Sequence, residues 1–147
     1  MAYEQLKLGN QICFRLYTVS RLVIQSYRPY LDKIGITYPQ YLVLMTLWEQ
    51  DNQLVSDISK KLVLESNTVT PLIQRMEKEG LVIRTKGLVD TRQRIISLTK
   101  KGKKLEEAAK DIPHCLTDRL LSCNVNLEEV KALAVPLDHL ITSLAKE

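Results

Sequence analysis

Residues 62–80, LVLESNTVTPLIQRMEKEG, predict an amphipathic helix and decide the fold of the chain. Apolar side chains recur in this stretch at spacings of three and four residues, which places them on one stripe of a helix. The stripe consists of Val69, Leu72, Ile73 and Met76. The opposite arc carries small polar and basic side chains, namely Thr68, Thr70, Gln74, Arg75 and Lys78. One face of this helix can therefore dock on the domain while the other faces a partner.

Clear boundary signals surround this helix. Ser66 or Asn67 is expected to cap its start, and Gly80 is expected to end it. A short helix over about 54–62 comes before it, and two β-branched segments joined by GLVDT predict a hairpin over 82–98 after it. Helix, turn, helix and hairpin in this order are the elements of a winged helix-turn-helix.

Further helices are predicted on the N-terminal side. Residues 5–33 have mostly helical apolar spacing, and Gly35 closes this helix. Thr37 and Gln40 have the spacing of a capping box, which starts a second helix. Its run 41–48 is apolar almost all round, so we expect this helix to be buried.

The C-terminal side is also expected to be helical. A helix that follows the hairpin runs toward Ile112 and is broken or kinked by Pro113. A last helix over about 126–146 is capped near Asn126 and bent by Pro136. The predicted fold class is therefore mainly α with a small β-hairpin, or α+β.

Composition limits the class of protein. The 147 residues are 45% hydrophobic and 26% charged, which is typical of one globular domain with a core of its own. No apolar run approaches the roughly 18 residues of a membrane span, and the first residues do not resemble a secretion signal. Three cysteines, an odd number, do not favour a secreted disulfide framework. We therefore expect a cytoplasmic protein with reduced thiols and no membrane partner.

The charge of the chain is concentrated in its middle. Residues 51–104 hold twelve lysines and arginines against six acidic residues, whereas the rest of the chain is slightly acidic. With the winged helix-turn-helix order, this predicts double-stranded DNA as the partner. Arg75 can reach a guanine edge or a phosphate in the major groove. The hairpin offers three basic side chains to the backbone or the minor groove: Lys86, Arg92 and Arg94.

Other chemistries find no support in the sequence. The aromatic strands of RRM domains, the GXXG loop of KH domains and the paired CxxC of zinc fingers are missing, which excludes these three classes. No phosphate loop, nucleophile elbow or hydrolytic triad appears, so we predict no enzyme and no cofactor. His114 and His139 have no partners at metal-ligand spacing, so no metal site is predicted.

Residues 56–105 resemble the DNA-binding half of the MarR family of transcriptional regulators. The LTxxG motif after the second predicted strand and the DxR of Asp90 and Arg92 in the wing are typical of this family. The segments NQICFRLY and ITYPQYLVLMTLWE are similar to its OhrR branch, the repressors that sense organic hydroperoxides.

This resemblance implies an obligate homodimer that binds a palindromic operator. Residues 1–147 are expected to form a single MarR-type domain. The helices in 1–36 and 105–147 are expected to form the dimerisation region, and 37–104 the winged helix-turn-helix lobe.

The resemblance also implies major-groove contacts by the helix over 66–79, the recognition helix, and a minor-groove contact by Arg92. The DNA-binding residues predicted from sequence and resemblance are Ser66, Asn67, Thr68, Thr70, Gln74, Arg75, Lys86, Arg92 and Arg94. The chain departs from the branch at 65–67, Glu-Ser-Asn in place of the usual Asp-Ser-Gly, and at 87–89, Gly-Leu-Val in place of a densely charged wing. A less charged wing tip is expected to weaken phosphate contacts there.

Cys13 aligns with the reactive cysteine of the OhrR branch. On a helix, Cys13 and Tyr17 lie one turn apart on the same face. Tyr27 lies about 21 Å further along the axis, so it can approach Cys13 only when two copies pair antiparallel. The resemblance implies this arrangement, in which Tyr27 and Tyr38 of the partner donate hydrogen bonds to the sulfur.

A thiolate in such a site attacks a peroxide and becomes a sulfenic acid. An apolar pocket around it favours organic hydroperoxides, and the oxidised dimer is expected to lose its half-site spacing. Cys123 is the first candidate for a resolving thiol and Cys115 the second. A low-molecular-weight thiol is the alternative.

Four other interpretations remain open at this point. Cys13 is a small core residue, since free cysteines are among the most buried residue types. The second interpretation is a MarR-type regulator of a small phenolic ligand, with an inert Cys13. The third is a broader redox regulator that uses the same thiol. The fourth is a thiol peroxidase, which would leave the basic helix and wing without a purpose.

Overall fold

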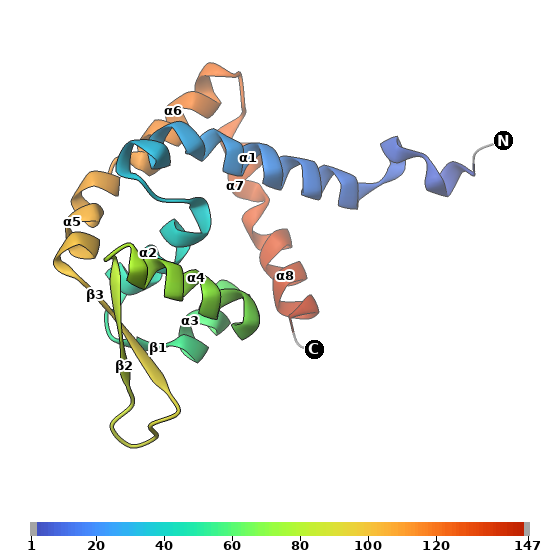
Figure 1. The fold of residues 1–147 in the computed structure, drawn as a ribbon. Helices are drawn as coiled ribbons and strands as arrows, with labels where there is room; N and C mark the ends of the chain where they lie inside the picture. The colour runs from blue at the N-terminus through green and yellow to red at the C-terminus, as the bar shows by residue number, and fades with distance from the viewer. Residues whose placement is uncertain (1–2, 146–147) are drawn as a thin grey trace.

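The computed structural model describes residues 3–145, and there the predicted mainly helical fold with a small antiparallel sheet is confirmed (Figure 1). The helices are α1 (Ile12–Ile34), α2 (Tyr38–Glu49), α3 (Val55–Leu62), α4 (Ser66–Lys78), α5 (Lys100–Ala109), α6 (Ile112–Ser122), α7 (Leu127–Ala132) and α8 (Ala134–Leu144). The strands are β1 (Gln53–Leu54), β2 (Val82–Lys86) and β3 (Arg94–Leu98), in the sheet order β1–β3–β2. No helix within this part of the chain is long and apolar enough to cross a membrane.

Helices α3 and α4 form the helix-turn-helix, and the hairpin of β2 and β3 forms the wing. In the hairpin, Val82 pairs with Leu98 and Lys86 pairs with Arg94. The short strand β1 pairs with the other edge of β3 and leads directly into α3. The predicted order of helix, turn, helix and hairpin is therefore confirmed.

The apolar stripe of α4 lies at the centre of the core. Val69, Ile73 and Met76 are fully buried, and Leu72 is nearly so. Gly80 ends the helix with a positive φ of 74°, a conformation that favours glycine, as the sequence predicted.

The predicted cap of α4 by Ser66 or Asn67 is wrong. Glu65 occupies the cap position with an extended backbone, and no side chain there accepts a hydrogen bond from the first turn. A glutamate is not among the short side chains that serve well as helix caps. Ser66 and Asn67 instead lie in the first turn with exposed side chains, which makes both available to a partner.

Helix α2 begins with the predicted capping box, which the structure confirms. The hydroxyl of Thr37 accepts from the backbone N–H of Gln40 at 3.4 Å, and Oε1 of Gln40 accepts from the backbone N–H of Thr37 at 3.0 Å. The amide nitrogen of the same side chain donates to the carboxylate of Glu79 at 2.8 Å. Gln40 is only 2% exposed, so one buried amide joins the start of α2 to the end of α4.

Helix α1 begins at Ile12, later than the residue 5 that was predicted. Two 3-10 turns, Glu4–Leu6 and Leu8–Asn10, come before it. The Arg15 guanidinium folds back and donates to the carbonyl of Gly9 at 2.7 Å and to that of Gln11 at 3.1 Å. These bonds stabilise the non-helical turns, and the later start places Cys13 in the first turn of a 23-residue helix.

The C-terminal region holds more helices than predicted. Pro113 stands in the first turn of α6, where its missing N–H costs no helical hydrogen bond, so it starts a helix that was overlooked. The expected last helix is divided at Leu133 into α7 and α8. Pro136 explains the break, because its ring conflicts with the carbonyl of Ala132 in a continuous helix. The predicted cap by Asn126 is confirmed. Its Oδ1 accepts hydrogen bonds from the backbone N–H groups of Glu128 at 3.0 Å and Glu129 at 3.3 Å, in the first turn of α7.

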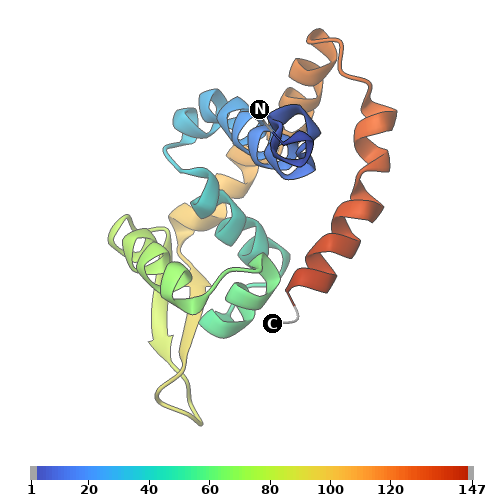
Figure 2. The same cartoon turned by 90° about the vertical axis from the view of Figure 1, so that its right-hand side faces the viewer.

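The first and last helices expose large apolar side chains. On α1 these are Ile12, Phe14, Leu16, Val19, Leu22 and Ile24. Near the C-terminus they are Leu121, Val130, Leu133, Val135, Leu140, Ile141 and Leu144. Figure 2 shows α7 and α8 descending beside the lobe, with α1 seen nearly end-on. Exposed apolar surfaces of this kind are typical of interaction sites.

Candidate nucleic-acid interface and thiol site

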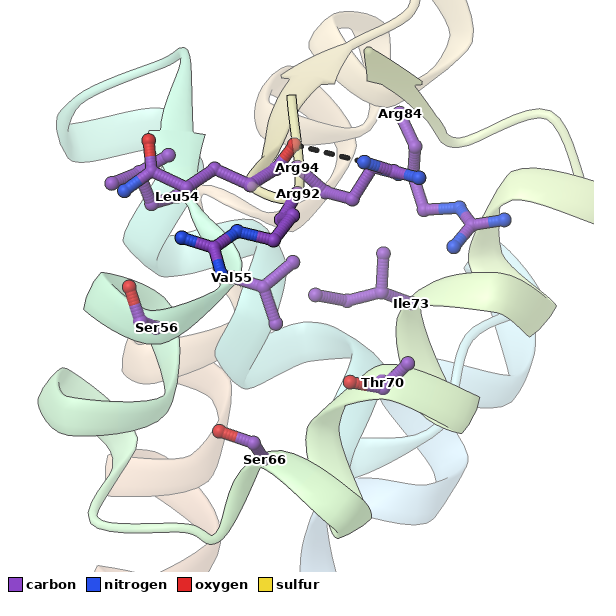
Figure 3. A pocket seen from close by; sticks show the side chains of 10 residues that line it. Leu54, Val55, Ser56, Ser66, Thr70, Ile73, Arg84, Arg92 and Arg94 are labelled. Atoms are coloured by element: carbon purple, nitrogen blue, oxygen red, sulfur yellow. Dashed lines mark hydrogen bonds between the residues drawn. The ribbon is translucent and has the colours of Figure 1, made fainter. Parts of the chain in front are cut away.

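A groove of about 430 Å³ lies between the recognition helix α4 and the wing (Figure 3). Its polar lining combines hydroxyls from the helices with guanidinium groups and one amide from the hairpin: Ser56, Ser66, Thr70, Arg84, Arg92, Gln93 and Arg94. Four of the predicted DNA-binding residues thus line one groove, although they are up to 28 positions apart in the sequence. Hydroxyls and guanidinium groups are suited to phosphate oxygens and base edges.

The other predicted DNA-binding residues lie outside this groove. Asn67, Thr68, Gln74 and Arg75 are exposed along α4, and Lys86 is exposed at the end of β2. All of them are accessible to a large ligand. Only Thr68 and Asn67 contact one another, through a 3.5 Å hydrogen bond between their side chains.

Ser56 and Arg84 also line the groove, but the sequence analysis missed both. Ser56 lies in the first turn of α3, and Arg84 lies on β2. Arg84 could have been found from strand alternation, because it shares a face with the buried Val82. Its guanidinium pairs with Glu77 of α4 at 3.2 Å, and its backbone N–H donates to the same carboxylate at 3.2 Å. This pair joins the recognition helix to the wing.

Arg92 and Arg94 occupy different environments in the wing. The Arg92 side chain is 91% exposed and pairs with Asp90 at 3.2 and 3.4 Å. The side-chain hydrogen bond from Arg92, supported by one from its backbone N–H, lowers the pKa of Asp90. Arg94 instead donates to the carbonyl oxygens of Thr91 at 2.8 Å and Gln93 at 3.1 Å. Arg92 therefore extends outward, whereas Arg94 holds the wing loop together.

The three cysteines are free thiols, and Cys13 is exposed. Cys13 therefore does not lie in the core that a single chain forms. Tyr17, one turn further along α1, is 69% exposed. Cys123 is exposed at the end of α6, whereas Cys115 is half-buried and its carbonyl accepts from the Tyr30 hydroxyl at 3.4 Å.

Tyr27 and Tyr38 lie together at the opposite end of α1 from Cys13. Their ring centroids are 5.0 Å apart, and Tyr41 lies 5.9 Å from Tyr27 and 6.2 Å from Tyr38. Burial raises the pKa of all three phenols above the usual value, so they remain protonated donors at neutral pH. Tyr41 was missed as a member of this group, although it follows Tyr38 by one turn of a capped helix. Within one chain, this tyrosine cluster and Cys13 do not meet.

No group of three or more potential metal ligands occurs among residues 3–145.

Known proteins resemble the chain along nearly its full length. A family model described as transcriptional regulator SarA/Rot matches residues 25–109. The organic hydroperoxide resistance transcriptional regulator of Bacillus subtilis is 42% identical over 130 residues, which cover 88% of each chain. Both descriptions are those of transcriptional regulators.

Solved structures of AbfR, a protein of Staphylococcus epidermidis, are similar to the chain. Reduced AbfR bound to DNA superposes with a TM-score of 0.78 at 39% identity, covering 99% of this chain and all of that one. The disulfide-formed AbfR superposes with a TM-score of 0.64 at 41% identity, covering 98% and 96%. Overoxidised AbfR bound to DNA superposes with a TM-score of 0.76, so the chain is more similar to the DNA-bound structures of that protein than to its disulfide form.

Proposed function

The chain belongs to the MarR/SarA family of winged-helix transcriptional regulators, and we propose that it represses its operator until an organic hydroperoxide oxidises Cys13. The observation that carries the proposal is an exposed thiol in the first turn of α1, in a chain that also has a DNA-binding groove. Such a regulator acts in the cytoplasm, where its DNA lies.

The DNA contacts of the repressor come from α4 and the wing. Ser66, Asn67, Thr68 and Thr70 enter the major groove with the first turns of α4, where short side chains allow close approach. Further along the same helix, Gln74 and Arg75 reach base edges or phosphates. From the wing, Lys86 contacts the backbone and Arg92 enters the minor groove. Arg94, also predicted as a DNA contact, lines the same groove, and its hydrogen bonds hold the wing loop as well.

The repressor is a homodimer on a palindromic operator. Support comes from the exposed apolar side chains on α1 and on the C-terminal helices, which one chain leaves uncovered. Antiparallel pairing of two α1 helices covers the apolar side chains of α1 and brings Cys13 of each chain to the tyrosine cluster of the other. The α1 rise of about 21 Å between Cys13 and Tyr27 makes pairing within one chain impossible.

The reactive group is the Cys13 thiolate. Only the thiolate form of a cysteine attacks a peroxide. The Cys13 side chain lies in the first turn of α1 and is exposed, so a hydroperoxide can reach it. The protonated phenols of the partner's Tyr27 and Tyr38 add hydrogen-bond donors.

Oxidation transfers one oxygen atom to the sulfur. The thiolate attacks the terminal peroxide oxygen, so an S–O bond forms while the O–O bond breaks. The sulfur loses two electrons and becomes a sulfenic acid, and the alkoxide that leaves takes a proton from water to become an alcohol. The sulfenic acid is uncharged, so the phenols lose the anion that held them in place.

Helix α2 connects the tyrosine cluster, which shifts when this anion is lost, to the recognition helix α4. Tyr38 and Tyr41 flank Gln40, whose buried amide holds Glu79 at the end of α4. A shift of the tyrosine cluster therefore moves the first turn of α2 and, with it, the two recognition helices of the dimer. Half-sites in DNA have a fixed spacing, so such a shift releases the operator.

Cys123 is the resolving thiol that we favour. It is exposed, whereas Cys115 is half-buried and its backbone is tied to Tyr30. Attack by the Cys123 thiolate on the sulfenic sulfur forms an intersubunit disulfide and releases water after protonation. A low-molecular-weight thiol is the alternative resolving partner.

A gel shift on DNA from upstream of its own coding region tests this function. Cumene hydroperoxide is expected to release the wild type but not Cys13→Ser, and Cys115→Ser serves as a matched control that still responds. Equal release of wild type and Cys13→Ser would exclude Cys13 as the sensor. Consumption of many peroxide molecules per subunit without DNA binding would indicate a thiol peroxidase instead.

A further inference from the structure

The tip of the wing displays two apolar side chains entirely to solvent. Leu88 is 97% exposed and Val89 is 102% exposed, the highest values among the exposed large hydrophobic residues described. Figure 1 shows the hairpin extending from the lobe at the end of the molecule away from α1 and α6. Neither side chain can therefore be covered by the apolar surfaces of α1 that await a second copy.

The loop that carries these side chains is held by its own hydrogen bonds. The backbone N–H of Gly87 donates to the carbonyl of Gln93 at 3.0 Å, and the backbone N–H of Gln93 donates to the carbonyl of Asp90 at 3.1 Å. A Cβ atom at Gly87 would lie 2.5 Å from the carbonyl oxygen of Asp90, so only glycine permits this closure. The guanidinium of Arg94 ties the loop at Thr91 as well. These bonds close the loop on both sides of Leu88 and Val89, which form its tip.

The charges of the tip cancel one another. Residues 87–93 contain one acid, Asp90, and one base, Arg92, and these two are paired. The tip therefore offers phosphates little beyond Arg92, whereas Lys86 at the base of the hairpin carries an exposed positive charge. What distinguishes the tip is apolar surface, which suits the sugar-lined walls and floor of the minor groove.

We propose that Leu88 and Val89 make an apolar contact in the DNA minor groove beside the major-groove site of α4, and that this contact selects A·T over G·C pairs there. Arg92 and Gln93, which follow the tip, line the same groove as Ser66 and Thr70 of α4, so the tip continues the DNA-binding face. The amino group of guanine projects from the minor-groove floor and excludes close apolar contact. The inference rests on the proposed DNA-binding function.

The first test compares Leu88→Ala/Val89→Ala with the wild type on the upstream DNA fragment over a range of salt concentrations. Loss of two buried apolar contacts is expected to weaken binding by about tenfold. The slope of log K against log salt stays unchanged, because no phosphate contact is lost. Arg92→Ala, by contrast, is expected to lower that slope by about one.

Ile83→Ala is the matched control, since Ile83 is an exposed apolar residue of the same hairpin. It alternates with Arg84, so it faces away from the groove, and its replacement is expected to leave affinity unchanged. Double-variant affinity within twofold of the wild type would overturn the proposal while leaving DNA binding intact. A wild type that binds no upstream DNA would overturn the proposed function and this inference together.

The second test replaces A·T pairs beside the α4 footprint by inosine·cytosine or by G·C. Inosine·cytosine keeps the minor-groove surface of A·T, whereas G·C adds the amino group. The wild type is expected to lose about tenfold on G·C and nothing on inosine·cytosine, and the double variant is expected to bind all three equally. An equal loss of the double variant on G·C would assign the selectivity to other residues and overturn the proposal.

Discussion

The DNA-binding lobe and the long terminal helices differ in how much of their structure one chain completes. In the lobe, α4 buries its apolar stripe fully, and side-chain bonds such as Arg84 to Glu77 hold its parts together. On α1 and α8, large apolar side chains stay exposed. Cys13 and the tyrosine cluster lie at opposite ends of α1. The DNA-binding face is thus complete in a single chain, whereas the proposed sensor requires two.

The largest effect on operator binding is expected from charges placed on the exposed apolar face of α1. Leu16 and Val19 lie on one side of the helix at a spacing of three residues. Leu16→Glu/Val19→Glu places two charges in the proposed dimer interface and is expected to weaken operator binding at least a hundredfold.

Analytical ultracentrifugation checks the oligomeric state of this variant, and circular dichroism checks that the lobe stays folded. Ile83→Glu, an equally exposed site on the hairpin, provides the control and should remain dimeric. A dimeric Leu16→Glu/Val19→Glu protein would show that this face of α1 is not the interface.

A smaller effect is expected at the junction between the two regions. Gln40→Ala removes the buried bond to Glu79 and half of the capping box, which is expected to cost about 1–3 kcal/mol of unfolding free energy. Chemical denaturation measures this loss, with Gln50→Ala at the exposed end of α2 as control. The coupling is also tested, because Gln40→Ala should release DNA less completely on oxidation than the wild type does. A variant as stable and as responsive as Gln50→Ala would remove Gln40 from the relay.

The smallest effect concerns the tyrosine cluster at high pH. The folded state raises the phenol pKa of Tyr27, Tyr38 and Tyr41, so folding favours their protonated forms. Their contribution is complete below the ordinary tyrosine pKa and is lost as the pH rises through the raised values. Thermal melts from pH 8 to 11 should show this decline, and it should be shallower in Tyr38→Phe. An identical decline in both proteins would place its origin outside the cluster.

Much of the lobe could be predicted from sequence because its signals are local. The stripe of α4 and the capping box of Thr37 follow from spacings of three or four residues. The start of α1 could not be predicted, since it depends on how Arg15 folds back onto Gly9. Pro113 was interpreted as the end of a helix, although the same residue type also begins one.

The candidate site was predictable to the same extent. Residues on the polar arc of α4 were found because they share one helix. Ser56 was missed, since its place beside the others depends on how separate elements pack. Arg84 and Tyr41 were missed although strand alternation and the helical spacing from Tyr38 were signals in the sequence. Arg94 was found as a basic residue, but its bonds to the wing loop could not be deduced from its charge.

The separation of Cys13 from Tyr27 along α1 has a genetic consequence. In a dimer paired as proposed, each sensor takes its cysteine from one subunit and its phenols from the other. A chain with Cys13→Ser and a chain with Tyr27→Phe are each defective alone, because both of their sensors carry the lesion. A mixed dimer of the two has one sensor with both lesions and one with none. Two alleles that fail separately therefore yield a mixed dimer that keeps one complete sensor, whereas neither homodimer has any.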